Sequence, residues 1–397
     1  TGQVDFVTPF NKIHSIEAGA KYIARNNKSE NDRYVNNTLI PSDYDNFRHK
    51  NNILGAYTGY SLKKGKWGTK VGLRLETTLL KAEFLDDRSK DFDADYTNLV
   101  PSATMTYQLK PMQNIRFGYN MRISRPGIRQ LNPFTNNSDP NYISVGNPDL
   151  DVAKSHSFSL NYGFFNPKFN LNLNASYSFE NNGIEYFTYL DNSGGNTVSV
   201  STYDNIGKRK RFNISGYISW SPTMKLRIFS NLSGGYTDIK ANSDKSGLSQ
   251  LSNSGFNGQG FAGIQYTLPW TMTAHGNAGI FTQDVNLMGS GSTFYFHSFS
   301  LRKTMMQQRL NISVYASNPF TKEFTYKNKQ DTYEYTSEMK NIFKQRQFGI
   351  SVSYRFGELK TQIKKAQRSI KNDDVMSSGS GGEGGEGGQG GSQSGGQ

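Results

Sequence analysis

Apolar and polar side chains alternate strictly in several long segments of the chain. In residues 169–179 every second position is apolar, and each position between is Asn or Ser. The same alternation runs through residues 71–79, 115–123, 212–220 and 310–316. Because successive side chains of a strand point to opposite faces, each segment predicts a β-strand with one apolar and one polar face.

The connections between these segments alternate between short and long. Short turns are expected near residues 10–12, 63–67, 110–114, 166–168, 221–225, 268–272 and 305–309. Longer polar connections are expected near 28–47, 86–94, 125–150, 187–200, 238–255, 283–292 and 318–338. A β-sandwich with Greek-key connections would not keep this order. The order is typical of an up-and-down transmembrane barrel, with tight periplasmic turns and long outer loops.

The segments add up to about fifteen strands, an odd number, whereas bacterial single-chain barrels have an even number. The last strand, residues 348–356, ends in Phe356 and is expected to end at the periplasmic rim, which makes the short turns periplasmic. The first strand, near Gln3–Thr8, then also runs inward. We therefore expect at least one strand before residue 1, and a barrel of about 22 strands with a plug would fit this deficit.

Composition agrees with a barrel and disfavours other classes. Hydrophobic residues make up 35% of the chain, the mean hydropathy is −0.67, and no apolar run is long enough for a transmembrane helix. Aromatic residues nevertheless reach 13%, and a barrel can place them on its lipid face and in its interfacial girdles. The net charge of +13 comes from scattered Lys and Arg rather than a cluster, so we expect no nucleic-acid partner.

Three regions are expected along the chain. Residues 1–356 would form the C-terminal portion of an outer-membrane β-barrel. Residues 357–375 would form a short basic segment in the periplasm, helical by the spacing of its apolar positions. Residues 376–397 are almost entirely Gly, Ser, Glu and Gln, which have little to bury, and predict a disordered tail.

Short motifs with Pro and Asn give the chain its most specific resemblance. The elements Arg125-Pro126, Leu131-Asn132-Pro133-Phe134, Asp139-Pro140 and Gly146-Asn147-Pro148-Asp149-Leu150 follow one another closely. Together with Gln3-Val4-Asp5 and Tyr354-Arg355-Phe356-Gly357, they resemble the outer-membrane β-barrel family of Bacteroidota that is grouped with TonB-dependent receptors. The resemblance covers nearly the whole chain.

This resemblance implies nutrient binding and uptake through the outer membrane, with the C-terminal tail in the periplasm. The implied partners are outer-membrane lipid, a surface lipoprotein or other complex subunits, and TonB acting through a region upstream. No TonB box occurs in this sequence, so a non-transporting scaffold barrel in an outer-membrane complex is the alternative. A diffusion porin is a third possibility. No motif indicates an enzyme.

The Pro-rich segment supplies the candidate ligand-binding residues Arg125, Arg129, Phe134 and Tyr142. The alternative interpretation is a rigid structural loop that folds over or into the barrel mouth. Asn132 and Asn147 would then turn the chain through bonds from their side chains to the backbone.

The inward positions of the predicted strands carry charges, which are expected to be either a solvated wall or part of an anion or sugar path. These residues are Arg74, Glu76, Arg116, Arg122 and Arg227. Asp91, Asp93 and Asp95 form a weak calcium candidate, because alternate Asp oxygens can ligate calcium, although the EF-hand Gly and Glu are missing. The five His residues are dispersed, there is no Cys, and we expect neither a cofactor nor another metal site.

Overall fold

The computed structural model describes residues 1–30, 34–39, 46–85, 91–192, 195–242, 248–332 and 335–357. The elements are β1 (Gly2–Pro9), β2 (His14–Ser29), β3 (Tyr34–Val35), β4 (Thr38–Leu39), β5 (Phe47–Lys64), β6 (Trp67–Phe84), β7 (Phe92–Lys110), β8 (Gln113–Ser124), α1 (Ile128–Leu131), β9 (Asn136–Asp139), β10 (Tyr142–Ser144), β11 (Ala153–Phe165), β12 (Phe169–Asp191), β13 (Val198–Trp220), β14 (Leu226–Ala241), the 3₁₀ helix η3 (Leu248–Gln250), β15 (Ser252–Leu268), β16 (Met272–Thr282), β17 (Gly289–Gly291), β18 (Thr293–Met305), β19 (Leu310–Ser317), β20 (Glu323–Asp331), β21 (Thr336–Lys344) and β22 (Gln347–Tyr354). The predicted basic segment and tail, beyond residue 357, lie outside these described residues.

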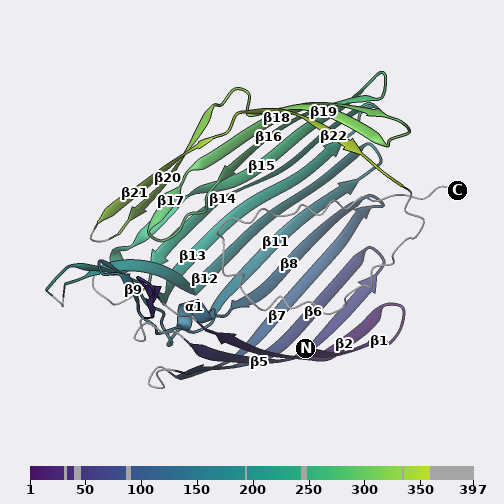
Figure 1. The fold of residues 1–397 in the computed structure, drawn as a ribbon. Coiled ribbons are helices and arrows are strands. Elements are labelled where there is room, and N and C mark those ends of the chain that lie inside the picture. The colour runs from purple at the N-terminus through teal and green to yellow at the C-terminus, as the bar shows by residue number, and fades with distance from the viewer. Residues whose placement is uncertain are drawn as a thin grey trace.

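One curved antiparallel sheet forms the wall of the molecule (Figure 1). Fifteen of the described strands follow one another around it in chain order: β1, β2, β5, β6, β7, β8, β11, β12, β13, β14, β15, β16, β18, β19 and β22. Each pairs with its neighbours in the up-and-down order that the alternation predicts. The predicted fold class is thus confirmed, together with the count of about fifteen strands.

Tight turns join the strands at one end of the sheet, which we call the short-turn end. They fall where the sequence predicts them; residues 65 and 66, for example, are all that separates β5 from β6. Gly65 has φ of +56°, a conformation that costs glycine little because it has no Cβ. The turn between β11 and β12 is held by Asn166, whose side chain accepts hydrogen bonds from the backbone N–H groups of Lys168 and Phe169 at 2.8 Å.

The opposite end, the long-loop end, differs from the expectation. Much of the sequence expected as polar connections is strand: β12 and β13 run on to Asp191 and from Val198, and residues expected in the last connection form the β20–β21 hairpin. The strict alternation ends there because apolar residues of β12 such as Phe187 and Leu190 stand on opposite faces of the strand, among polar ones. Backbone pairing does not depend on that alternation, so the strands continue without it.

The two faces of the wall differ in chemistry. The face that carries Leu73, Leu75 and Leu79 is convex, and these three side chains remain 42–50% exposed. Aromatic residues lie at the short-turn end of this apolar band, where the rings of Trp67 and Tyr107 are 4.4 Å apart. Such a surface suits hydrocarbon between two interfacial belts and would be poorly solvated by water.

The buried side chains gather at the long-loop end rather than along the middle of the wall. There, apolar residues of the connections pack on the concave face in three clusters. No helix among the described residues is long and apolar enough to span a membrane.

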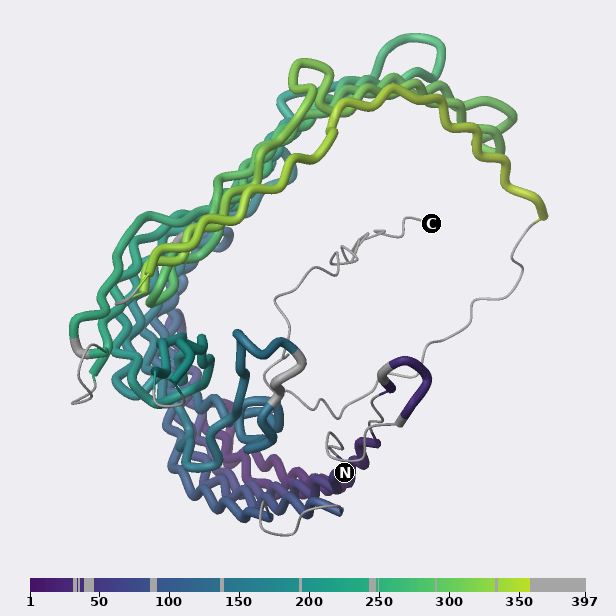
Figure 2. The backbone as a smooth tube through the Cα atoms, turned by 60° about the vertical axis from the view of Figure 1, so that its left-hand side comes forward, coloured from purple at the N-terminus to yellow at the C-terminus, as the bar shows by residue number. Residues whose placement is uncertain are grey.

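The two edges of the sheet remain separate in the described structure. β1 pairs with β2 alone, and β22 pairs with β19 alone. Figure 2 shows the resulting open arc, with the purple first strand and the yellow last strand at its two ends.

Candidate binding surface at the long-loop end

Residues 125–152, which we call the inner strap, connect β8 to β11 across the concave face of the wall (Figure 2). The strap contains α1, whose Leu131 is fully buried against Leu80 of β6 and Leu150 of the strap's far end. Ile128 packs on a second cluster, with Ala82 and Phe84 of the same strand. These contacts identify the even-numbered positions of β6 as its concave face.

The Asn and Gly residues of the strap motifs fix its backbone. Asn132 accepts a hydrogen bond through Oδ1 from the N–H of Phe134 at 3.0 Å, and Asn147 does the same for Asp149 at 3.0 Å. The predicted turns at these two residues are thereby confirmed. The N–H of Gly146 donates to the carbonyl of Asn132 at 2.8 Å. A Cβ at position 146 would lie 2.4 Å from that oxygen, so the approach requires glycine.

The strap is also tied to β13. β10 pairs in parallel with that strand, and Asn147 donates a hydrogen bond from Nδ2 to the carbonyl of Tyr203 at 3.0 Å. From β7, the hydroxyl of Tyr96 donates to the carbonyl of Leu150 at 2.8 Å. Strands on both sides of the strap therefore hold it against the wall.

Arg125 anchors the beginning of the strap. Its guanidinium forms an ion pair with Glu76 and donates from Nε to Thr78 Oγ1 at 2.8 Å. Arg74 contacts the same Glu76 carboxylate. Glu76 and Arg125 are both buried, so the carboxylate and the two guanidinium groups compensate one another's loss of hydration. The structure thus gives Arg125 a structural role in the strap.

The other three candidate ligand residues of the strap do not form one cluster with Arg125. Arg129 is exposed on α1 and lines a cavity of about 430 Å³. Phe134 follows the Asn132 turn and is partly buried. The hydroxyl of Tyr142, an exposed residue, lies 2.5 Å from that of Tyr186 in β12. Of the four, Arg129 is the cation best placed to meet a ligand.

The five candidate wall charges lie on the concave face. Residues paired across neighbouring strands point to the same face of a sheet, so the face of Leu80 and Ala82 can be followed from strand to strand. It includes all five charges, which stand in β6, β8 and β14: Arg74, Glu76, Arg116, Arg122 and Arg227. Arg116, Arg122 and Arg227 are exposed, and the Arg227 guanidinium lies 5.6 Å from the ring centroid of Phe229.

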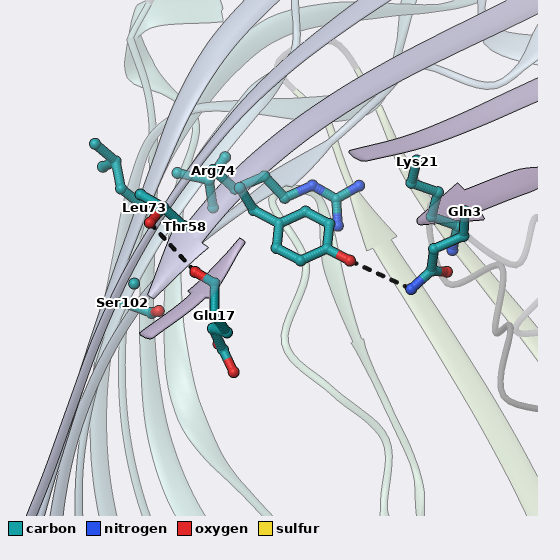
Figure 3. A pocket seen from close by; sticks show the side chains of 10 residues that line it. Gln3, Glu17, Lys21, Thr58, Leu73, Arg74 and Ser102 are labelled. Carbon is teal, nitrogen blue, oxygen red and sulfur yellow. Dashed lines mark hydrogen bonds between the residues drawn. The ribbon is translucent and has the colours of Figure 1, made fainter. Parts of the chain in front are cut away.

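A polar pocket opens on this face between the first strands (Figure 3). It has a volume of about 370 Å³, and Gln3, Lys21, Tyr57 and Arg74 are among the residues that line it. Glu17, also in the lining, pairs with Lys70 at 2.7 Å. The concave wall here is polar and wet.

A second segment, residues 283–292, also folds onto the concave face, over β13 and β14. We call it the inner cap. Its side chains Val285, Leu287 and Met288 are buried against a cluster that includes Ile206 and Ile239. Sequence reasoning missed this contact. The only signal was a short apolar run inside a polar connection.

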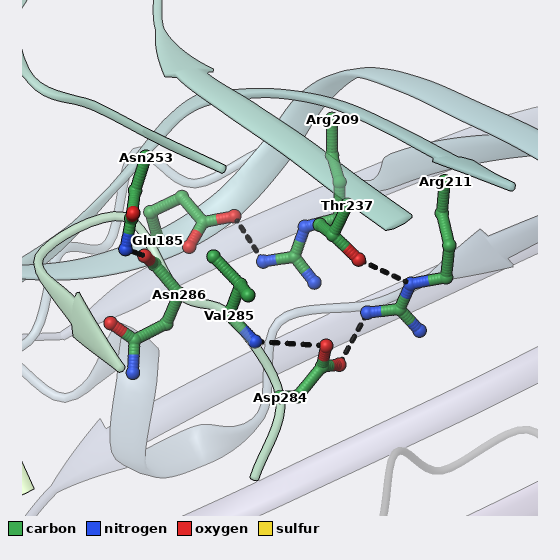
Figure 4. A network of polar contacts seen from close by, with 8 residues as sticks. All are labelled: Glu185, Arg209, Arg211, Thr237, Asn253, Asp284, Val285 and Asn286. Carbon is green, nitrogen blue, oxygen red and sulfur yellow. Dashed lines mark hydrogen bonds and ion pairs between the residues drawn. The ribbon is translucent and has the colours of Figure 1, made fainter. Parts of the chain in front are cut away.

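Polar contacts complete the inner cap (Figure 4). Asp284 pairs with Arg211 and accepts from Asn257 Nδ2 at 2.6 Å. Nearby, Arg209 donates to Glu185 Oε1 at 2.9 Å. Glu185 lies 16 residues along β12 from its short-turn end, beyond the 9–11 residues that a strand needs to cross a bilayer. Burial raises the pKa of Glu185, and the Arg209 charge opposes this rise.

The acidic residues proposed for calcium do not converge. Asp91 accepts a hydrogen bond from the N–H of Phe84 at 2.6 Å, and Asp93 is paired across the ladder with Lys81. Asp95 is paired with Leu79 on the convex face. Among the described residues no group of three or more acidic or His side chains could hold a metal ion. Asp86 and Asp87, two further acidic residues of the same predicted outer loop, lie outside the described residues.

A curved antiparallel wall with an apolar convex face and a charged concave face defines a transmembrane β-barrel protein. Residues 1–354 match the model of the outer membrane protein β-barrel family, and the chain belongs to that family. No curated protein matches the sequence.

Solved structures of transporters share the fold. The copper transporter OprC has a TM-score of 0.62 at 12% identity, over 89% of this chain and 55% of that chain. The ferric citrate transporter FecA has a TM-score of 0.62 at 13% identity, over 89% of this chain and 53% of that chain. The FrpB iron transporter of Neisseria meningitidis has a TM-score of 0.60 at 12% identity, over 89% of this chain and 55% of that chain. This chain therefore spans about half the length of the solved proteins that it matches.

Proposed function

We propose that this chain is the barrel portion of a TonB-dependent-receptor-like protein that binds a nutrient outside the cell and carries it across the outer membrane. The observation that carries the proposal is the concave face. A wall of fifteen described strands curves around more space than its own side chains fill, in contrast to an eight-stranded barrel. The inner strap and the inner cap cover only its long-loop end.

The chemistry of that face supports passage of a polar solute. It presents exposed Arg116, Arg122 and Arg227, and a polar pocket near Arg74. The proteins with the same fold are named as transporters of copper, iron and ferric citrate, which is consistent with uptake. The reaction is binding and passage, with no covalent chemistry.

The orientation follows from the same proposal. The short turns and the C-terminus face the periplasm, and the long-loop end faces outward, as in other barrels of this class. An unpaired strand edge is unfavourable in lipid, so further strands join β1 to β22 and close the barrel. A plug and a TonB-binding segment belong to that additional part.

Depletion of the growth medium tests the uptake function. The bacterium that carries the gene is compared with strains that lack either this gene or TonB, and solutes in the medium are followed by mass spectrometry. We expect the same small set of solutes to disappear more slowly in both mutants. Slower disappearance in the gene mutant alone would indicate a diffusion porin. No difference in either mutant would contradict transport.

A second candidate function is a scaffold within an outer-membrane protein complex. It is favoured by β21, in which every residue is exposed, including Met339, Ile342 and Phe343. These apolar side chains stand on a hairpin that projects at the long-loop end, where a surface lipoprotein or another subunit could cover them. Affinity purification of the full-length protein, with and without polar substitutions at these three positions, tests this candidate.

A further inference from the structure

A cavity of about 430 Å³ lies where α1 of the inner strap meets the outer ends of β2 and β5. It is lined by Asn27, Lys28, Ser29, Phe47, His49, Ile128, Arg129 and Asn132. We call it the His49 pocket. His49 is paired across the ladder with Asn27 on one side and with Ala82 on the other, so it stands on the concave face beside the strap.

His49 is the unusual member of this lining. Its side chain is only 7% exposed, yet neither ring nitrogen has a hydrogen-bond partner among the residues that the structure describes. Buried polar groups in native proteins are almost always paired, because an unpaired one gives up its bonds to water without replacement. An imidazole kept in this state beside a cavity indicates that a ligand supplies the missing partner.

The charges of the lining select the ligand. Lys28 and Arg129 are cations, and Asn27, Asn132 and Ser29 supply further hydrogen-bonding groups. None of the described lining residues is acidic. Lys28 is paired with Glu30, which lies outside the lining, whereas α1 presents the exposed Arg129 at the cavity. Burial lowers the pKa of His49, so its ring is neutral near pH 7 and offers one N–H donor.

We propose that the His49 pocket binds the anionic group, a carboxylate or a phosphate, of a soluble ligand. Arg129 supplies the charge and can meet either group with two parallel N–H donors, and His49 donates a third hydrogen bond. The concave position excludes the lipid headgroups of the membrane as the source of the anion. The inference deepens the proposed uptake function, on which its biological meaning rests, by naming the chemistry of the solute.

Nuclear magnetic resonance of the full-length protein in detergent micelles, with ¹³C-labelled His rings, tests the proposal. Inorganic phosphate, succinate and the neutral control glycerol are titrated separately at pH 7, and the His49 signal is assigned as the one absent from His49→Gln. We expect phosphate or succinate to shift this signal saturably, and glycerol to leave it unchanged. Saturation by one anion and not the other identifies which group the pocket prefers.

Two substitutions make the test specific. Arg129→Gln is expected to weaken anion binding at least tenfold, because it removes the charge that the neutral His49 cannot replace. Lys208→Gln removes an exposed cation of β13 at the same end, outside the pocket lining, and should leave the affinity unchanged. Heat modifiability on gels confirms that each variant is folded.

The proposal is overturned if neither anion shifts the His49 signal saturably, or if Arg129→Gln and Lys208→Gln bind alike. Its failure is separable from failure of the uptake function. Slower solute depletion in both mutant strains without anion binding would leave uptake standing and remove this pocket. Anion binding with unchanged solute depletion would leave the pocket standing and remove the uptake function.

Discussion

The inner strap and the inner cap cover the same face of the wall at the same end, but different forces hold them. The strap is shaped by its own backbone, where Gly146 meets Asn132, and it is held on the wall by the pairing of β10 with β13 and by the buried ion pair of its first residue, Arg125. The cap is docked through side chains, with Val285, Leu287 and Met288 filling an apolar cluster and Asp284 pairing with Arg211.

This difference explains why one segment is visible in the sequence and the other is not. A backbone that must turn sharply or approach another backbone closely accepts few residue types, chiefly Gly, Asn and Pro. Aliphatic side chains that fill a cluster can be exchanged for others of similar size. The strap therefore carries a motif, and the cap carries an inconspicuous apolar run.

The largest loss of stability is expected when the buried ion pair that anchors the strap is broken, because the cap has no buried ion pair of this kind among the described residues. Glu76→Gln removes the carboxylate that compensates buried Arg125, which should cost about 3–5 kcal/mol of the free energy of unfolding. Urea unfolding in lipid vesicles measures this cost. Glu17→Gln, which breaks the more exposed pair with Lys70, is the control and should cost no more than about 1 kcal/mol. Equal costs for the two variants would contradict a buried anchor.

Gly146→Ala tests the close backbone approach of the strap. The added Cβ would meet three backbone atoms of Gln130 and Asn132 within 2.8 Å, so the two halves of the strap must move apart. We expect a loss of about 3 kcal/mol. Gly68→Ala adds a Cβ that meets nothing within 4 Å and serves as the control in the same unfolding assay. A neutral Gly146→Ala variant would show that the motif is not required for docking.

Leu287→Ala tests the cap. The side chain is buried in the apolar cluster, and its truncation should cost about 2–3 kcal/mol. Limited proteolysis of the folded protein should then cut within the cap while the strap stays protected. Met224→Ala, at a fully exposed turn, is the control. Cleavage of both segments would mean that strap and cap form one cooperative unit.

High pH should act on the strap. Burial raises the pKa of Tyr96 to about 12, above the usual value of about 10. A raised folded-state pKa means that the stabilisation is complete below pH 10 and is lost as the pH rises toward 12. We expect a loss of about 1–2 kcal/mol over this window. Tyr96→Phe should lack this component when unfolding is measured from pH 9 to 12. If Tyr96→Phe loses as much stability between pH 9 and 12 as the wild type does, the loss comes from a group other than Tyr96.

Low pH should act beside the cap, with the smallest effect. The hydrogen bond from Lys329 lowers the pKa of Asp331 below its usual 3.8, and the backbone N–H of Asp331 donates to Met288 of the cap at 2.6 Å. The stabilisation by the ionised Asp331 carboxylate is complete above pH 3.8 and is lost as the pH falls through the lower folded-state pKa. Hydrogen exchange of the β20–β21 hairpin should quicken there, and Asp331→Asn should show less change with pH.

Much of the fold was predictable because the alternation of side chains along a strand appears as a period of two between residues that are close in the sequence. The alternation in residues 169–179 fixes the two faces of β12, and the turn at Gly65 follows from a residue suited to φ of +56°. The extension of β12 and β13 beyond the apolar band was not predictable. Strand pairing there continues through the backbone, which leaves no periodic signal when each face carries both apolar and polar side chains.

The sequence by itself determined that the wall is antiparallel, that its convex face is apolar, and that the segment around Asn132 and Asn147 turns sharply. These features depend on neighbours within a few residues. Only the tertiary structure decided that Arg125 is buried on Glu76 while Arg129 lines a cavity, and that the cap seals against Ile239. The strands that bring these residues together are far apart in the chain, and the sequence encodes no distance between them.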